Sequence, residues 1–198
     1  TENEPPLLKE LSRVTYQKVL QPRMLSGHYQ GRILSLIAKI IRPKKILELG
    51  TFTGYSALCL AEGLAPNGEI HTIDKNEELV EIQSHFFNRS AYSSQIYQHT
   101  GNALEIIKKL NQNYDLIFID ADKPNYVNYF KLLIDKINCG GVIISDNVLW
   151  SGKVIEPIDE EDISTKILLE YNKLLKEDPR LETVLLPIRD GLTLSIKK

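Results

Sequence analysis

The stretch KILELGTFTGYS, residues 45–56, joins a short apolar strand to a helix through a turn that contains two glycines. The apolar strand ends at Gly50, and a helix is expected from Thr53 to Ala65. A strand, a tight turn and a helix in this order begin a β-α unit. Because the rest of the chain repeats this alternation, the sequence predicts the α/β fold class.

Outward from this stretch, helices are expected over residues 7–20 and from Ser26 as N-cap to Pro43. Further strands are expected at 69–74, 95–99, 114–120 and 142–146, the last after a turn at Gly140-Gly141. The helices between them are expected at 76–90, 102–110 and 124–137, and an acidic loop at 156–162 leads to a helix that ends near residue 178. Two final strands, 181–187 and 192–197, form a hairpin. The pattern predicts a Rossmann-like, doubly wound, mostly parallel seven-stranded sheet with a C-terminal antiparallel hairpin.

The composition is that of a soluble globular protein, with 42% hydrophobic and 25% charged residues. We expect one domain over residues 1–198, with residues 1–21 as a helical extension. A net charge of -2 provides no general field for nucleic acid or an anionic membrane. Cys59 and Cys139 lie in apolar surroundings and are expected to be buried thiols, which fits a reducing cytoplasm. The opening residues lack the basic-then-apolar order of a signal peptide.

Polar residues follow four of the expected strands at their carboxyl ends. In an open parallel sheet, ligands bind beyond these ends. The residues concerned are Glu48, Asp74, Asp120, Asp122, Lys123, Asp146 and Asn147. One or two such acids would be ordinary helix caps, but their shared position on one rim predicts a functional site.

The turn at residues 50–54 favours a ligand that approaches the backbone closely. Gly50 and Gly54 permit a sharp turn, and the following helix offers free N–H groups to an anion. Phe52 stands where a dinucleotide-binding turn has its middle glycine, so NAD and FAD are disfavoured. Asp74 ends the second strand, where a carboxylate can accept hydrogen bonds from ribose hydroxyls. A plain glycine-rich turn is the structural alternative.

Asp120, Asp146 and Asn147 provide three oxygen ligands at the ends of two strands that should be neighbours. Such hard donors select Mg²⁺, with Mn²⁺ or Ca²⁺ as alternatives, and leave about three octahedral positions for water and substrate. The alternative is that residues 146 and 147 only form a turn. The sequence therefore predicts a divalent cation site.

Lys123 lies three residues after Asp120 and is a candidate general base, since a neighbouring cation can lower the pKa of its amine. A surface lysine at a helix start is the alternative. Trp150 could line a pocket for an aromatic substrate, although core packing is nearly as good a reading. The four histidines share no ligand-like spacing, so we expect structural or surface roles for them.

From about Pro22 to its end, the chain resembles the cation-dependent O-methyltransferases that include caffeoyl-coenzyme A and catechol O-methyltransferases, especially small bacterial members. The matching segments are RMLSG at 23–27, LELGTFTGYS at 47–56, FIDADK at 118–123, DNVLWSG at 146–152 and DG at 190–191. Ser26 departs from the threonine of plant relatives. The region before residue 22, which in relatives helps shape the substrate pocket and dimer, carries little recognisable pattern.

The resemblance implies a class I methyltransferase fold, S-adenosylmethionine as methyl donor and a homodimer. It implies metal ligands at Asp120, Asp146 and Asn147, with Lys123 and Asp120 catalytic and Lys123 and Trp150 next to the substrate. The implied donor site is lined by Met24, Ser26, Glu48, Gly50, Phe52, Ser56, Asp74, Ala103, Asp120 and Asp122. Of these, Ser56 would hold the methionine carboxylate and Asp74 the ribose.

The expected reaction is methyl transfer to a hydroxyl of a small phenolic acceptor with two vicinal hydroxyls. Some bacterial relatives methylate a hydroxylated uridine in tRNA, so tRNA is an alternative acceptor. A protein that holds S-adenosylmethionine without transferring methyl is a second alternative. A nicotinamide-dependent dehydrogenase is a third, and it would need the glycine that Phe52 replaces.

Overall fold

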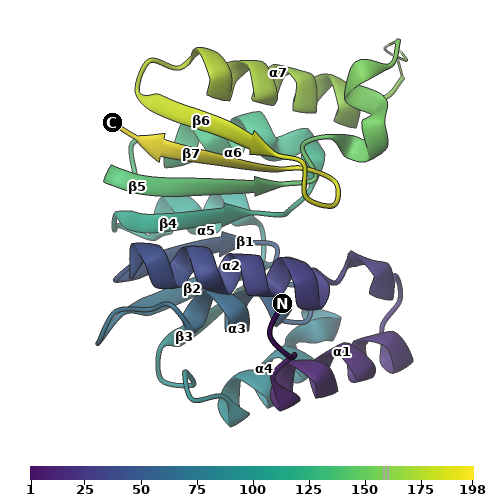
Figure 1. Ribbon diagram of the computed structural model, residues 1–198, viewed down its shortest axis with the longest axis vertical. Helices are drawn as coiled ribbons and strands as arrows, with labels where there is room; N and C mark the ends of the chain where they lie inside the picture. Colours follow the sequence, from purple (N-terminus) through teal and green to yellow (C-terminus); the bar gives the residue numbers. More distant parts are fainter. Residues whose placement is uncertain (158, 160) are drawn as a thin grey trace. The chain divides into compact units, whose positions relative to one another are not determined.

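The computed structural model describes residues 1–157, 159 and 161–198 (Figure 1). The acidic loop expected at 156–162 includes residues 158 and 160, which lie outside the described residues. By its internal contacts the chain divides into two compact units, Thr1–Ile106 and Ile107–Lys198. Helix α5 spans the boundary between them.

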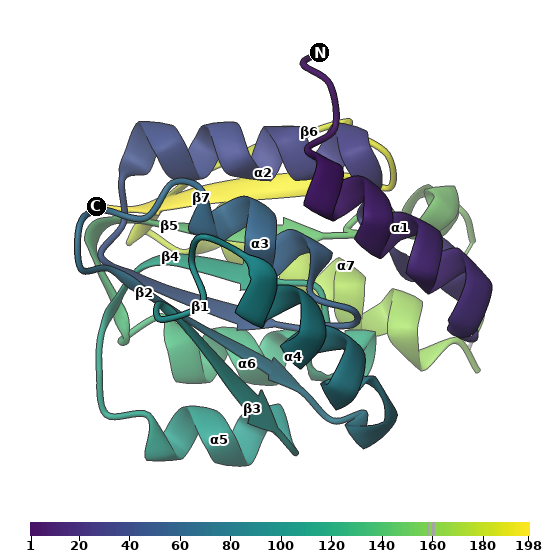
Figure 2. The ribbon, with the colours of Figure 1, turned by 90° about the horizontal axis from the view of Figure 1, so that it is seen from below.

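The first unit contains three parallel strands. Strand β2 pairs with β1 on one side and with β3 on the other, with Leu47 opposite His71 and Ile73 opposite His99. Helices α2 and α3 pack against each other (Figure 2). The elements in chain order are α1 (Pro6–Lys18), η1 (Pro22–Met24), α2 (Gly27–Ile41), β1 (Lys45–Leu49), α3 (Tyr55–Ala61), β2 (Glu69–Asp74), η2 (Glu77–Leu79), α4 (Val80–Arg89), β3 (Ile96–Thr100) and α5 (Ala103–Lys109).

The second unit contains one parallel and two antiparallel pairings. Strand β4 pairs in parallel with β5, β5 pairs antiparallel with β7, and β7 pairs antiparallel with β6. Helices α6 and α7 pack together. The elements are β4 (Tyr114–Ile119), η3 (Lys123–Asn125), α6 (Tyr126–Leu133), β5 (Ile137–Asp146), η4 (Trp150–Ile155), α7 (Ile163–Glu177), β6 (Leu181–Leu186) and β7 (Leu192–Lys197).

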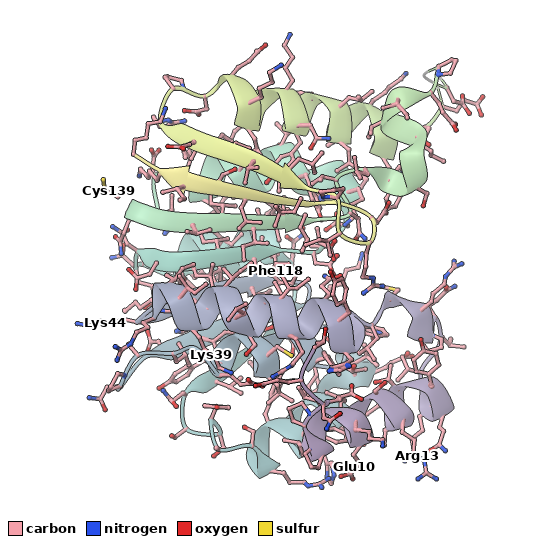
Figure 3. The ribbon with its side chains drawn as sticks, viewed as in Figure 1. Glu10, Arg13, Lys39, Lys44, Phe118 and Cys139 are labelled. Atoms are coloured by element: carbon pink, nitrogen blue, oxygen red, sulfur yellow. The ribbon has the colours of Figure 1, made fainter. Side chains whose placement is uncertain are left out.

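The strands form a seven-stranded mixed sheet in the order β3-β2-β1-β4-β5-β7-β6. Its first five strands are parallel, and its last two form the antiparallel hairpin. The predicted α/β fold class and the C-terminal hairpin are therefore confirmed. The apolar runs are buried as expected: Phe118 on β4, labelled in Figure 3, has no exposed surface. Burial of a side chain of this size stabilises the fold by about 1.5–3 kcal/mol.

The region between α6 and β5 differs from the prediction. The helix ends at Leu133 rather than at residue 137, and β5 begins at Ile137 rather than after Gly140-Gly141. Tyr114 pairs with Ile137 and Leu116 with Val142, so β5 contains extra residues in a bulge. Gly140 adopts a φ of 77° within this bulge, which is why the glycine pair lies inside a strand.

The prediction that both cysteines are buried is half wrong. Cys59 on α3 is buried, whereas Cys139 is exposed (Figure 3). Cys139 lies in the bulged part of β5, where Gly140 is exposed as well. A bulge turns side chains away from the regular alternation of a strand, so the apolar sequence around Cys139 did not indicate its exposure.

Helix ends in the first unit also differ in detail. Helix α3 covers Tyr55–Ala61 and is shorter than the predicted 53–65. It begins after Gly54, which has a left-handed φ of 93°. Ser26 stands at the N-cap of α2 as predicted, but its side chain makes no capping hydrogen bond.

Among the described residues, no helix has the length and apolar character that a membrane span requires.

Candidate active site

The turn between β1 and α3 adopts a strained backbone conformation. Gly50 and Gly54 have φ values of 97° and 93°, and Phe52 between them has a φ of 48°. A Cβ atom added to Gly54 would lie 2.5 Å from Cε1 of Phe87 on α4. Glycine is therefore required at position 54 both for its backbone conformation and for the close approach of α4.

Asp74 at the end of β2 holds this turn. Its Oδ2 accepts a 2.7 Å hydrogen bond from the backbone N–H of Phe52, and its Oδ1 accepts one of 2.9 Å from the N–H of Asn76. Each carboxylate oxygen can accept a second hydrogen bond. Asp74 therefore braces the turn and still has acceptor capacity for a ligand.

Gln83 on α4 holds the same turn from its other side. Its side chain is buried, and its Nε2 donates a 2.6 Å hydrogen bond to the backbone carbonyl of Phe52. Its Oε1 accepts a short hydrogen bond from Nε2 of Gln98 on β3. The strained Phe52 is thus fixed at both its N–H and its carbonyl, and a rigid turn of this kind is typical of a binding site.

Five of the other residues expected in the donor site lie in the first unit. Glu48 is buried on β1, and its Oε2 accepts a 2.5 Å hydrogen bond from Thr72. Ser56 lies in the first turn of α3, and Ala103 begins α5. Met24 in η1 is 60% exposed, whereas Ser26 before α2 is buried. These residues come from separate elements of the first unit, as the lining of a binding site commonly does.

The two predicted metal-binding aspartates follow neighbouring strands in the second unit. Ile119 on β4 pairs with Ser145 on β5, so Asp120 and Asp146 continue these strands side by side. Asn147 follows Asp146 with a left-handed φ of 58°, and its backbone N–H donates a 2.6 Å hydrogen bond to Oδ1 of Asp146. The structure therefore brings the three predicted ligand residues to one sheet edge.

Lys123 reaches into this group of oxygen atoms. Its Nζ lies 2.9 Å from Oδ1 of Asn147, 3.5 Å from Oδ1 of Asp120 and 3.5 Å from the backbone carbonyl of Asp146. A single cationic group thus contacts all three predicted ligand residues. The contacted oxygens are a carboxylate, an amide and a backbone carbonyl, which are all donor types that divalent cations accept, and the Asp146 carboxylate lies on the same residue.

Lys123 is buried in spite of its charge, with 8% of its side chain exposed. Burial lowers the pKa of its amine, while the carboxylates of Asp120 and Asp146 oppose this shift. The net effect is a lowered pKa of the amine, which a general base requires. The surface-lysine alternative is wrong for this residue.

Tyr126, the first residue of α6, supports Lys123. Its hydroxyl accepts a 2.5 Å hydrogen bond from the Lys123 ammonium and donates one of 2.9 Å to the carbonyl of Asp146. Burial raises the pKa of Tyr126 well above its ordinary value, so the phenol keeps its proton and remains a donor.

Asp122 and Trp150 are the two remaining predicted site residues of the second unit. The two carboxylate oxygens of Asp122 accept 2.5 Å hydrogen bonds from Tyr129 and Asn125, so Asp122 orders its own loop. The ring centroid of Trp150 lies 5.9 Å from Nζ of Lys123. Trp150 therefore borders the lysine, as a residue that lines the acceptor site would.

The hairpin between β6 and β7 fixes the segment after Asn147. The N–H of Leu149 bonds to the carbonyl of Asp190, and the N–H of Ser151 bonds to its Oδ1. Gly191 has a φ of 86°, and a Cβ there would lie 2.6 Å from Leu149. The distant Asp190-Gly191 pair is thus needed to shape the segment that contains Trp150.

Histidine and cysteine provide no alternative metal centre in the described part of the chain, where no three His, Cys, Asp or Glu side chains gather in a suitable way. His71 and His99 form a 2.8 Å hydrogen bond with each other across β2 and β3. This contact agrees with the structural role expected for them.

Sequence reasoning missed Gln83 and Tyr126. Both lie on helices. Tyr126 belongs to an aromatic run whose pattern predicts a buried core position, and Gln83 is one of many polar residues on its helix. The one available signal was position: Tyr126 lies three residues after Lys123, a spacing that places two side chains on one helix face.

Comparison with known proteins places the whole chain in one family. A family model described as O-methyltransferase matches residues 1–198. Caffeoyl-CoA O-methyltransferase 2 of Eucalyptus globulus is 38% identical over 96% of this chain and 81% of its own length. Caffeoyl-CoA O-methyltransferase 1 of Arabidopsis thaliana is 37% identical over 96% of this chain and 78% of its own length.

Two solved structures support the same family assignment. The O-methyltransferase from Bacillus cereus in complex with SAH has a TM-score of 0.92 and 29% identity, covering 99% of this chain and 92% of that one. TomG, an O-methyltransferase from Streptomyces achromogenes in complex with SAM, has a TM-score of 0.91 and 26% identity, covering 99% and 91%. The chain therefore belongs to the O-methyltransferase family and is a methyltransferase.

Proposed function

We propose that this methyltransferase transfers a methyl group from S-adenosylmethionine to one hydroxyl of a small phenolic molecule with two vicinal hydroxyls, with the help of a divalent cation. The single observation that carries the proposal is the convergence of Asp120, Asn147 and the Asp146 carbonyl on the Lys123 ammonium. This convergence supports a site in which oxygen ligands for a cation lie beside a base. The SAM and SAH complexes of the structural relatives support the choice of donor.

The first unit would hold the methyl donor, which supplies an activated methyl group. Asp74 would accept hydrogen bonds from the ribose hydroxyls with the capacity that Phe52 and Asn76 leave on its oxygens. Ser56 in the first turn of α3 would hold the carboxylate, where helical N–H groups favour an anion. The turn at Phe52, fixed by Asp74 and Gln83, would keep these groups in place without further ordering.

The second unit would hold the acceptor. Asp120, Asp146 and Asn147 would bind the cation, preferably Mg²⁺, which when bound favours the deprotonated form of an acceptor hydroxyl. Lys123 would take the hydroxyl proton at Nζ, since burial already lowers the pKa of its amine. Trp150 would face the aromatic ring of the acceptor.

An acceptor panel tests the proposal. Catechols, matched phenols with one hydroxyl and undermodified tRNA are incubated with S-adenosylmethionine and Mg²⁺, and release of S-adenosylhomocysteine is measured. We expect turnover of the catechols and little turnover of the phenols. Turnover confined to tRNA would contradict the small-molecule acceptor, and binding of S-adenosylmethionine without any turnover would contradict catalysis.

The Asp120→Ala variant tests the role of the second unit separately from donor binding by the first. Asp120→Ala should abolish turnover while S-adenosylhomocysteine still binds, because Asp74 and the turn that it holds are unchanged. Wild-type turnover in Asp120→Ala would contradict the cation site. The homodimer that the resemblance implies and the cytoplasmic location stay predictions, and sedimentation velocity tests the first.

A further inference from the structure

Tyr126 makes the shortest polar contact of the buried lysine. Its hydroxyl lies 2.5 Å from Nζ of Lys123, closer than the 2.9 Å to Asn147 and the 3.5 Å to Asp120. Its ring centroid also lies 4.5 Å from Nζ, within the range of a cation–π contact. Tyr126 therefore provides the lysine with both a hydrogen-bond acceptor and an aromatic face.

The tyrosine is itself held rigidly. Its side chain is fully buried, and its ring packs edge-on against Tyr171 of α7 with centroids 5.2 Å apart. Its hydroxyl donates to the carbonyl of Asp146, the last residue of β5. A group that is fixed on several sides can hold a flexible lysine chain in one place, because little freedom remains to be lost.

The lysine needs such a partner because of its surroundings. Its amine already contacts Oδ1 of Asn147 at 2.9 Å and Oδ1 of Asp120 at 3.5 Å, which are atoms that a bound cation would need. An ammonium that binds only those atoms competes with the metal, whereas one that also binds the Tyr126 hydroxyl is more easily displaced from them. The position of Nζ thus determines both proton transfer and access of the cation.

We propose that Tyr126 is a positioning residue that draws the Lys123 amine toward its own hydroxyl, so that Nζ stays beside the ligand oxygens and a cation can displace it from Asn147. The proposal rests on the proposed function for its catalytic meaning. The contact between the two side chains, by contrast, exists in the metal-free chain and is tested without a metal.

The first experiment is a double-mutant cycle of thermal unfolding in EDTA with Tyr126→Phe, Lys123→Met and the double variant. Tyr126→Phe loses the hydrogen bond from Lys123 and those to the backbone carbonyls of Asp146 and Ile119, and it should lower Tm by roughly 6 °C. In the Lys123→Met background only the hydrogen bonds to the two backbone carbonyls are lost, and the decrease should be roughly 3 °C. Equal decreases in both backgrounds would mean that the hydroxyl does not hold the lysine, and the proposal would be wrong.

The second experiment measures Mn²⁺ affinity by calorimetry and steady-state kinetics. Tyr126→Phe should weaken Mn²⁺ binding roughly tenfold and lower kcat roughly tenfold, with KM for S-adenosylmethionine unchanged. In the Lys123→Met background, Tyr126→Phe should change Mn²⁺ affinity less than about twofold. Unchanged kcat and Mn²⁺ affinity in Tyr126→Phe would overturn the positioning role.

Tyr171→Phe is the matched control. Tyr171 is a buried tyrosine that touches the Tyr126 ring, but its hydroxyl bonds to Ser145 at 2.5 Å. It should lower Tm with the same decrease in both Lys123 backgrounds and leave kcat unchanged. A wild type that binds no Mn²⁺ and keeps its activity in EDTA would refute the proposed function, while the cycle in EDTA still decides whether Tyr126 holds Lys123.

Discussion

The backbone N–H of Phe52 donates a 2.7 Å hydrogen bond to Oδ2 of Asp74. This bond joins the turn after β1 to the end of β2, the next strand of the sheet. It also compensates for the left-handed φ of Phe52, an uncommon conformation for a bulky residue. The acid that is expected to bind the ribose therefore also maintains the shape of the turn.

Asp74→Asn should weaken S-adenosylhomocysteine binding about tenfold to a hundredfold, since an amide replaces charge-assisted bonds worth about 1.5–3 kcal/mol each. The measurement is isothermal calorimetry. Asp135→Asn is the control, because Asp135 has 84% of its side chain exposed. An unchanged Kd in Asp74→Asn would contradict the role of Asp74 in donor binding.

Gly54→Ala should destabilise the fold by about 3 kcal/mol, because a Cβ meets Phe87 at 2.5 Å and the φ of 93° is unfavourable for alanine. Gly152→Ala is the control for backbone strain alone, since Gly152 has a φ of 85° and open space around its Cβ position. Urea unfolding compares the two. If both variants lose the same stability, the contact with Phe87 is unimportant.

The stability of the fold should depend on pH through Glu62, which lies at the interface of α2 and α3. Burial raises the pKa of its carboxyl, but hydrogen bonds from Arg32, Lys39 and Ser35 outweigh this and lower the pKa from 4.5 to about 2. Lys39 is labelled in Figure 3. The lowered pKa means that the ionised carboxylate stabilises the fold above pH 4.5, and that this contribution is lost as the pH falls from 4.5 toward 2.

Glu62→Gln should therefore lose about 2 kcal/mol of stability at pH 7 and progressively less below pH 4.5. Urea unfolding at pH 7, 4 and 3 measures the difference from the wild type. The exposed Glu182→Gln variant serves as control. A difference that stays constant from pH 7 to pH 3 would mean that the charge of Glu62 contributes nothing.

Much of the fold could be predicted because its strands carry strong patterns. The run Leu116–Ile119 is buried on both faces and reads as a parallel strand. Asp120 and Asp146 could be placed together because carboxyl ends of neighbouring parallel strands meet at one edge. The bulge in β5 could not be predicted, since Asn138 to Gly141 carries no strand pattern and the register with β4 passes directly from Ile137 to Val142.

The supporting residues of the site could not be predicted for a related reason. Tyr126 and Gln83 act through contacts with Lys123 and Phe52 that tertiary packing creates. In the sequence, an aromatic residue on an apolar helix and an amide on a polar one fit ordinary helices equally well. Residues that bind ligands at strand ends show a pattern, whereas residues that position them do not.

The central claim is that Asp120, Asp146 and Asn147 bind a divalent cation that methyl transfer requires. The most direct measurement is turnover of a catechol by the wild type in excess EDTA, followed by addition of Mg²⁺. We predict that EDTA lowers kcat roughly a hundredfold or more and that Mg²⁺ restores it. Undiminished turnover in EDTA would contradict the claim.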